Sequence, residues 1–419
     1  MKAREKLTEN PGVTAAMKTV FWMAQEDIPL KKYSSLVDFL KIQGCQDLKK
    51  IEVSKNATYH SRSSAEEFQS SIAQVIEEDQ LAVIKKSPCF SILIDESTDI
   101  SVSKRMIVYI RVVNQDFVPQ TLFLENICID DVKSSADVLF KHLIQCLSEK
   151  GLDINKCLGF GSDGASVMTG RHNGVASKVK QKSPHCVAIH CMAHRLNLCS
   201  SQASKGIEYL KTFEKTCTDL YYYFGGSKSG NRKCELTEIQ KVLDDPRINV
   251  KECHEIRWLS FSSAIDAISK TYSSLVTYFK SHGESSTTAK SVYDKLTDYR
   301  FVFCLHLLLD ILPHVAQLSL LFQKQNIDIA AVRPAIDTLK KKIKLAESGS
   351  SSSQTDLKDK LVQTKDKSDS NKVKALKFKG FNLTFGKDLS KTSKELTEVR
   401  KKFCSNLRQN IVPLSRRNP

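Results

Sequence analysis

The spacing of apolar positions changes twice along the chain. In the first 86 residues apolar side chains recur at helical intervals, as Phe68, Ile72 and Val75 do. Over residues 87–200, short runs rich in β-branched residues alternate with helical stripes, which is typical of an α/β domain. Beyond residue 200 the strand signals stop, and helical spacing predicts an all-helical region over residues 201–345.

The α/β region begins with three strands whose connections are short enough for antiparallel hairpins. The elements expected in chain order are strands at residues 90–95, 105–114 and 117–129, a helix at 134–150, a strand at 156–162, a helix or a turn plus helix at 164–181, a strand at 186–191 and a helix from His194. Three strands followed by helix, strand, helix and strand is the order of the ribonuclease-H-like fold. We therefore predict an α/β, ribonuclease-H-like mixed sheet with an all-helical insertion and an N-terminal helical segment.

Two aspartates close apolar strands where burial alone would not select a carboxylate. Asp95 ends the run that begins at Phe90, and Asp163 follows the run that begins at Cys157. In the predicted fold these positions are neighbours, so the two carboxylates can converge on one divalent cation. Carboxylate oxygens hold Mg²⁺ or Mn²⁺, which can activate a water or a 3′-hydroxyl in phosphoryl transfer. The structural alternative is that each aspartate belongs to an ordinary turn.

The charge of the chain points to an acidic partner. The 419 residues carry a formal net charge of +16, with a pI near 9.2, and nucleic acid is the most common partner of such a chain. The excess is concentrated at residues 340–419, which hold 21 Lys and Arg against 8 Asp and Glu. We interpret residues 346–419 as a basic low-complexity tail, which is either solvated or a phosphate-binding arm.

Cysteine usage and hydropathy indicate a reducing compartment without a membrane span. The thirteen cysteines lack the dense, even spacing of a secreted scaffold, and no signal peptide opens the chain. The longest apolar stretch, residues 301–322, is interrupted by His306, Asp310 and Pro313. We expect a nuclear protein, with the cytosol as a second location.

One cysteine and histidine cluster raises the question of zinc. Cys186, His190, Cys191, His194 and Cys199 are close in sequence, but their spacing matches no standard zinc site. A strand with this composition is more typical of small buried thiols. We therefore do not expect zinc here.

Four segments resemble those of hAT-superfamily DNA transposases, in the same order along the chain. They are FSILIDESTD at residues 90–99, GFGSDGASVMTG at 159–170, CMAHRLNL at 191–198 and RWLS at 257–260. The resemblance covers the chain from about residue 13 to about residue 345. It is especially close to domesticated vertebrate members that carry zinc fingers upstream of a transposase-like body.

The resemblance implies roles for individual residues. Asp95 and Asp163 match the first two members of the family's Asp-Asp-Glu metal-binding triad, and His194 matches its Cys-x-x-His element. Arg257 and Trp258 match the Arg-Trp pair of the helical insertion, where the ring stacks on a flipped base and the Arg supports DNA handling in active members. By spacing alone, Trp258 would instead be a core residue of a helix.

Parts of the family pattern have no counterpart here. We find no Ser-x-x-Glu-Arg-x-Phe-Ser-like segment to supply the third acid, no C-terminal dimerisation segment and no N-terminal zinc finger. We therefore expect no strand cleavage and predict a transposon-derived nuclear protein that binds DNA, with Mg²⁺ or Mn²⁺ affinity at Asp95 and Asp163. Two alternatives stay open, a fragment of an active hAT transposase and a scaffold for nuclear protein partners in SUMO-linked regulation. The predicted domains are residues 1–86, 87–200, 201–345 and 346–419.

Overall fold

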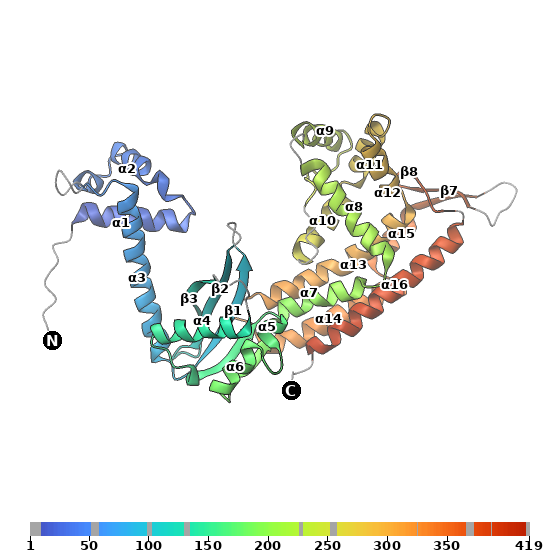
Figure 1. Cartoon of the computed structure of the whole chain (residues 1–419). Coiled ribbons are helices and arrows are strands. Elements are labelled where there is room, and N and C mark those ends of the chain that lie inside the picture. Colours follow the sequence, from blue (N-terminus) through green and yellow to red (C-terminus); the bar gives the residue numbers. More distant parts are fainter. Residues whose placement is uncertain are drawn as a thin grey trace. The chain divides into compact units, whose positions relative to one another are not determined.

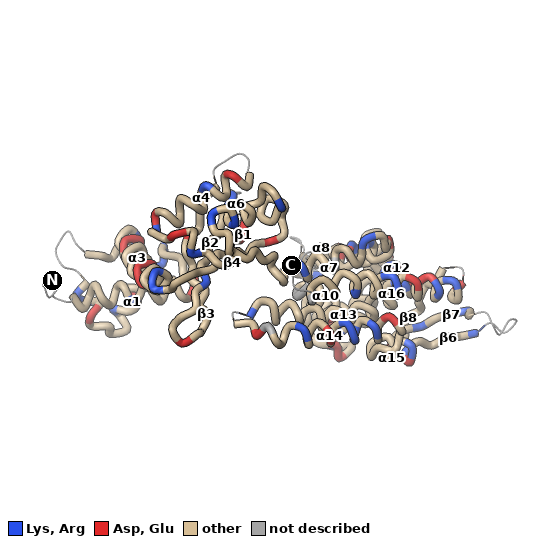
Figure 2. The backbone as a smooth tube through the Cα atoms, turned by 90° about the horizontal axis from the view of Figure 1, so that it is seen from below, with Lys and Arg blue, Asp and Glu red and all other residues tan. Residues whose placement is uncertain are grey.

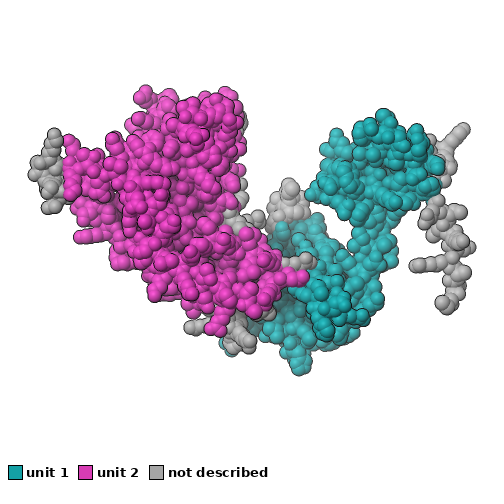
Figure 3. Space-filling model, turned by 180° about the vertical axis from the view of Figure 1, so that it is seen from behind, with its two compact units in different colours: residues 1–189 teal, residues 190–419 magenta. Residues whose placement is uncertain are grey.

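A computed structural model describes most of the chain. The described residues are 10–51, 58–98, 103–129, 135–225, 229–251, 258–324, 326–365, 373–386 and 388–415. The chain divides into two compact units, unit 1 over residues 1–189 and unit 2 over residues 190–419 (Figure 3). Unit 1 thus combines the N-terminal helices with the α/β region, which the sequence prediction had separated.

The N-terminal helices of unit 1 form a small core of their own. They are α1 (Pro11–Gln25), η1 (Leu30–Lys32), α2 (Tyr33–Ile42), η2 (Asp47–Lys50) and α3 (Arg62–Lys86). Asn10 caps α1 by accepting hydrogen bonds from the N–H groups of Gly12 and Val13. A Cβ on Gly12 would lie 2.5 Å from the Lys50 carbonyl, so glycine permits α1 and η2 to approach this closely. α3 then runs from this core to the sheet (Figure 1).

A five-stranded mixed sheet forms the centre of unit 1. Its strands are β1 (Phe90–Thr98), β2 (Lys104–Val113), β3 (Pro119–Ile129), β4 (Cys157–Ser162) and β5 (Val187–His190), in the order β3-β2-β1-β4-β5. β1 pairs antiparallel with β2 and parallel with β4, and β2 pairs antiparallel with β3. This arrangement confirms the ribonuclease-H-like fold predicted from the order of elements.

Helices cover one face of this sheet. They are α4 (Ala136–Glu149), α5 (Ser166–Thr169) and α6 (Val175–Lys182), with η3 (Ile154–Lys156) before β4. Alternate residues of β2, among them Met106, Val108 and Ile110, are fully buried in the same core as Leu139 and Leu143 of α4. Figure 1 shows α4 lying across the sheet.

Several element boundaries differ from the sequence prediction by a few residues. The helix predicted at 134–150 is α4, which Ser135 caps by accepting a hydrogen bond from the Val138 N–H. The helix expected from His194 begins at Met192, and the stretch predicted as a helix or a turn plus helix forms two short helices. Shifts of one or two residues at helix ends are usual.

Unit 2 is mostly helical. Its helices up to residue 348 are α7 (Met192–Ser204), α8 (Glu208–Gly225), α9 (Ser229–Val242), α10 (Trp258–Lys270), α11 (Tyr272–His282), α12 (Thr287–Leu296), α13 (Tyr299–Phe322) and α14 (Ile329–Ser348). α10 and α11 are separated at Thr271, and Ser286 caps α12 by accepting a hydrogen bond from the Ala289 N–H. This agrees with the all-helical region predicted for residues 201–345.

α13 is the central core helix of unit 2. It is the one helix among the described residues that is long and apolar enough to cross a membrane by composition. Most of it is buried, including the side chains of Phe301, Leu305 and Ile311. The burial accounts for its apolar sequence without a bilayer.

The segment expected to be a low-complexity tail contributes to this core. It contains α15 (Ser352–Lys360), β6 (Leu361–Lys365), β7 (Val373–Phe378), β8 (Phe381–Leu383), α16 (Leu389–Ile411) and η4 (Val412–Ser415). Leu396, Phe403 and Leu407 of α16 are buried, whereas Lys401 and Lys402 between them are exposed and Arg400 is partly buried. Figure 2 marks the positions of Lys and Arg along the backbone. The prediction of a tail was wrong for these residues, because a narrow apolar stripe is hard to see in a lysine-rich sequence.

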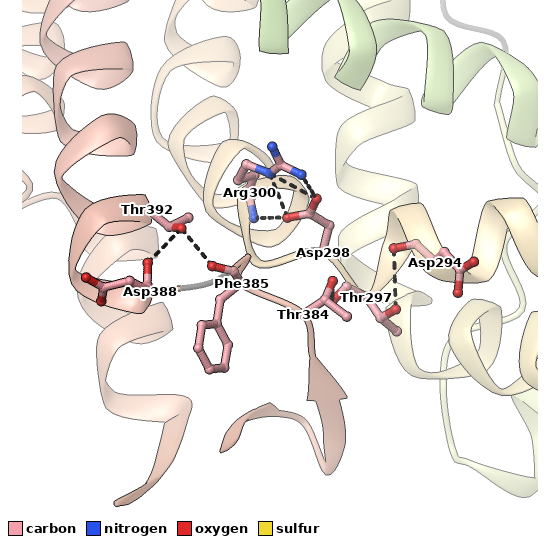
Figure 4. Close-up of polar contacts among 8 residues, drawn as sticks. All are labelled: Asp294, Thr297, Asp298, Arg300, Thr384, Phe385, Asp388 and Thr392. Carbon is pink, nitrogen blue, oxygen red and sulfur yellow. Dashed lines mark hydrogen bonds and ion pairs between the residues drawn. The ribbon is translucent and has the colours of Figure 1, made fainter. Parts of the chain in front are cut away.

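Backbone hydrogen bonds fasten this segment to the start of α13. The Thr384 N–H donates to the Thr297 carbonyl at 2.8 Å, and the Tyr299 N–H donates to the Thr384 carbonyl at 2.8 Å. Thr392 then closes the turn before α16 by donating to the carbonyls of Phe385 and Asp388 at 2.7 and 3.0 Å (Figure 4). Residues about 90 positions apart in sequence are therefore held side by side.

Candidate functional site

The two predicted acidic residues lie on neighbouring parallel strands of unit 1. Asp95 is an exposed residue of β1, and Asp163 directly follows β4. The register pairs Leu93 with Gly161, and each aspartate lies two residues further along its chain in the same direction. Because paired strands are about 4.8 Å apart, this register brings the two aspartates to the same level of the sheet.

Two glycines of β4 allow the side chains of β1 to lean over that strand. A Cβ on Gly159 would lie 2.4 Å from Ser91 Oγ, and a Cβ on Gly161 would lie 2.7 Å from Leu93 Cδ2. Either contact would force the strands or their side chains to shift. Close packing between β1 and β4 thus explains the two glycines that precede Asp163.

A third carboxylate, Glu96, belongs to the same cluster, and the sequence analysis did not single it out. Its pKa lies above the ordinary value because partial burial disfavours the ionised form and the Asp163 carboxylate adds repulsion. Lys104 opposes this effect, and Asp95 adds a smaller repulsion. The only sequence signal was the Asp-Glu pair at the end of β1. We call Asp95, Glu96 and Asp163 the acidic cluster.

Asp163 also has a structural role. Its Oδ1 accepts a hydrogen bond from the Ala165 N–H at 3.1 Å, which forms the turn that leads into α5. The turn that was considered as an alternative to metal binding is therefore present. It leaves other lone pairs of the carboxylate available, since an ionised carboxylate has about four acceptor sites.

The acidic cluster fits one hard cation better than two. Mg²⁺ is usually held by one or two carboxylates together with waters and phosphate oxygens, and Asp95 and Asp163 match that donor set. Within the described residues, no group of three or more His, Cys, Asp and Glu side chains is placed to hold a metal ion. A two-metal centre needs more ligands than this cluster supplies.

The cysteine and histidine cluster divides into separate parts. In unit 1, Cys186 Sγ lies 3.9 Å from Cys157 Sγ, and burial raises the pKa of Cys157 to about 12. In unit 2, the rings of His190 and His194 lie 5.3 Å apart, and Cys199 donates to a backbone carbonyl at 3.0 Å. These contacts are those of buried thiols and packed rings.

The remaining predicted site residues belong to unit 2. Arg257 lies outside the described residues, so its predicted DNA contact has no structural account here. Trp258 is the first residue of α10, and the structure describes its backbone. Their roles, like that of His194, stay predictions.

Comparisons with known proteins agree with the fold of unit 1. Residues 25–174 match the family DUF4371, described as the ZMYM1/FAM200 RNase-like domain. A stretch of 246 residues is 22% identical to General transcription factor II-I repeat domain-containing protein 2 of Bos taurus. That match covers 57% of this chain and 24% of the relative, so the chain spans about a quarter of the relative's length.

Proposed function

We propose that this chain is a transposase-derived nuclear protein that binds DNA and holds one divalent cation at its acidic cluster. The observation that carries the proposal is the placement of Asp95 and Asp163 at the same level of β1 and β4, in a sheet of ribonuclease-H-like order. The similarity to an RNase-like family supports descent from a protein that acts on nucleic acid.

In this proposal Asp95 and Asp163 would hold the cation. Mg²⁺ or Mn²⁺ there would supply a positive charge that offsets the negative charge of a DNA phosphate. Burial raises the pKa of Glu96 first, and the Asp163 carboxylate adds repulsion to that effect. A cation that binds there lowers the pKa of Glu96, because it offsets the repulsion from Asp163.

We do not propose that this chain cleaves DNA strands. In-line transfer needs the attacking and the leaving oxygen to be stabilised together, which two-metal sites achieve. The acidic cluster offers ligands for one cation only. The surplus of 16 positive charges provides the sequence-independent part of DNA affinity.

Mn²⁺ binding by the full chain tests the site. Free Mn²⁺ gives a sharp electron paramagnetic resonance signal, whose loss on titration reports binding. We expect one site, weakened about tenfold or more by Asp163→Asn and by Asp95→Asn, because one of two carboxylate ligands is lost. Asn at position 163 keeps an acceptor for the Ala165 N–H. Asp116→Asn, an exposed change in the β2–β3 turn, is the matched control.

DNA binding is measured with the same proteins. Fluorescence anisotropy with a labelled 30-base-pair duplex, at two salt concentrations and with Mn²⁺ or EDTA, should show affinity that falls with salt. The affinity should rise with Mn²⁺ in the wild type and in Asp116→Asn, but not in Asp163→Asn or Asp95→Asn. Equal Mn²⁺ dependence in Asp163→Asn and Asp116→Asn contradicts the cation site. Mn²⁺-dependent nicking of a supercoiled plasmid would instead favour an active transposase fragment.

The nucleus is the proposed location. The name of the matched relative refers to a general transcription factor II-I repeat domain, and the proposed DNA binding agrees with a nuclear location. A fluorescent fusion of the full chain should accumulate in the nucleus, and a purely cytoplasmic signal would contradict this part of the proposal.

A further inference from the structure

A second candidate site lies in unit 2, where α8 packs against α9 and α12 (Figure 1). The three helices enclose a groove of about 740 Å³. A volume of this size is typical of small-ligand sites. We call it the α8–α12 groove.

The groove is cationic. Lys215, Arg232 and Lys295 line it, and Asp219 is the only acidic side chain among its lining residues. Asp219 pairs with Lys295 at 3.1 Å, which joins α8 to α12 and uses the one negative charge. Lys215 and Arg232 therefore give the groove a net positive charge.

Arg232 is held in a fixed position. It donates a hydrogen bond to the Tyr223 carbonyl at 2.7 Å, and its guanidinium lies 4.1 Å from the centroid of the Tyr223 ring. A carbonyl is neutral, so this contact orients the guanidinium without cancelling its charge. A fixed guanidinium loses little entropy when it binds an anion.

Hydroxyl groups and an aromatic ring complete the lining. Ser286, Thr287 and Thr288 surround the start of α12, where backbone N–H groups point outward and favour anions. The ring of Tyr222 lines the same groove and is 65% exposed. Cations and hydroxyls match phosphate oxygens, and an exposed ring matches the face of a nucleobase.

We infer that the α8–α12 groove binds a nucleotide, with its phosphate between Lys215 and Arg232 and its base stacked on Tyr222. Single-stranded nucleic acid and a free mononucleotide share this chemistry. We favour single-stranded nucleic acid as the ligand, and that choice rests on the proposed function. The inference that the ligand is a nucleotide rests only on the residues that line the groove.

Lys215→Glu tests the phosphate contact in the full chain. Lys215 is exposed, so the substitution should leave folding intact, which circular dichroism and thermal melting check. Binding of fluorescein-labelled dT10 at low salt should weaken about tenfold, because reversing a charge at a phosphate contact is strongly unfavourable. Lys290→Glu makes the same charge change on α12, outside the groove lining, and should change the affinity less than about twofold.

Tyr222→Ala tests the stacking contact. Loss of one stacked base corresponds to about fivefold weaker dT10 binding or more, whereas Tyr222→Phe keeps the ring and should bind as the wild type does. An abasic oligomer of equal length should bind Tyr222→Ala and wild type alike. If Lys215→Glu matches Lys290→Glu and Tyr222→Ala matches the wild type, the inference is overturned.

Adenosine monophosphate separates the two sources of nucleotide. Binding of dT10 without binding of the mononucleotide identifies single strands as the ligand. Lys215-dependent binding of the mononucleotide, with no binding of any DNA by the wild type, contradicts the proposed function but supports the groove. DNA binding that ignores both Lys215→Glu and Tyr222→Ala supports the proposed function and contradicts the groove.

Discussion

The two sheets of this protein depend on different kinds of sequence information. Most strands of the five-stranded sheet carry an apolar pattern of their own, as the alternating burial of β2 shows, whereas the edge strand β5 has no buried residue. The three-stranded sheet β6-β7-β8 is mostly exposed along β6 and contributes single buried residues, Leu376, Phe378 and Leu383. One sheet is specified by local pattern, and the other by contacts with distant helices.

The contacts of Phe378 show this dependence. Its ring lies 5.4 Å from the ring of Tyr272 on α11 and 5.4 Å from that of His306 on α13. Burial lowers the pKa of His306, which bonds through Nδ1 to Ser353 at the start of α15. Residues up to about 100 positions apart therefore share one cluster, which no local pattern in β7 announces.

The largest expected effect comes from removing that ring. Phe378→Ala should lower the free energy of unfolding of unit 2 by about 3–5 kcal/mol, because the residue is 1% exposed and leaves a cavity. Urea denaturation, combined with hydrogen exchange of peptides from unit 2, measures the loss. Val362→Ala on β6 is the control, since Val362 is 60% exposed and should change stability by less than about 0.5 kcal/mol. If Phe378→Ala and Val362→Ala cause equal losses of stability, residues 361–383 do not contribute to the core of unit 2.

Asp310 gives the next largest effect. From α13 it accepts hydrogen bonds from Ser351 Oγ at 2.6 Å and from the N–H groups of Ser353 and Gln354 at 2.7 and 3.0 Å. Asp310→Ala removes the acceptor for the start of α15 and should cost about 1–3 kcal/mol. Asp337→Ala, on the exposed side of α14, should cost less than about 0.5 kcal/mol in the same urea titration.

The Asp310→Ala variant also tests whether the contact with α13 orders α15 and β6. In Asp310→Ala, hydrogen exchange should speed up first in α15 and β6 and leave the five-stranded sheet of unit 1 unchanged. Uniform acceleration across both units would show that the two sheets do not differ in the way proposed.

Thr392 has a smaller effect, confined to the turn before α16 (Figure 4). Thr392→Val keeps the shape of the side chain but removes the hydrogen bonds to the carbonyls of Phe385 and Asp388. The free energy of unfolding should fall by about 1 kcal/mol. Thr355→Val is matched in shape on an exposed helix face and should be nearly neutral. A loss of the same size in both variants would show that the bond to the Phe385 carbonyl adds no stability, because the Thr355 hydroxyl also donates to the carbonyl four residues before it.

Glu96→Gln has the smallest effect and probes the local sheet of unit 1. Because the folded pKa of Glu96 is raised, the folded state binds the proton more tightly, and this group's contribution to stability falls as pH rises between its unfolded and folded pKa values. At neutral pH, Glu96→Gln should therefore stabilise the protein by less than about 1 kcal/mol, since solvent screens an exposed group. Below the unfolded pKa the gain should vanish.

The pH dependence of that gain is the measurement. Thermal melts of wild type and Glu96→Gln at neutral and acidic pH should converge as the pH falls. If the two melting temperatures instead converge as the pH rises, the folded-state pKa of Glu96 is lowered and not raised. Repulsion from Asp163 would then be contradicted. Glu67→Gln, an exposed change on α3, should show neither trend.

The acidic cluster could be predicted in part from the sequence. Asp95 and Asp163 stood out because each ends an apolar run, and the order of elements put those runs on adjacent strands. Glu96 could not be singled out, because its raised pKa depends on burial in the folded sheet and, second, on a carboxylate 67 positions away. The α8–α12 groove was likewise invisible, since Lys215 and Arg232 are ordinary surface residues until α8, α9 and α12 pack.

The sequence by itself determined the five-stranded sheet and most of the helices, because most of these elements bury a face whose period can be read locally. Only the tertiary structure decided that the described residues between 351 and 415 join the core of unit 2. Their apolar residues are sparse and are surrounded by lysines, so burial becomes favourable only when α13 and α14 provide the opposite surface. Isolated apolar residues stabilise a fold through the partners they meet, and those partners lie far away in the sequence.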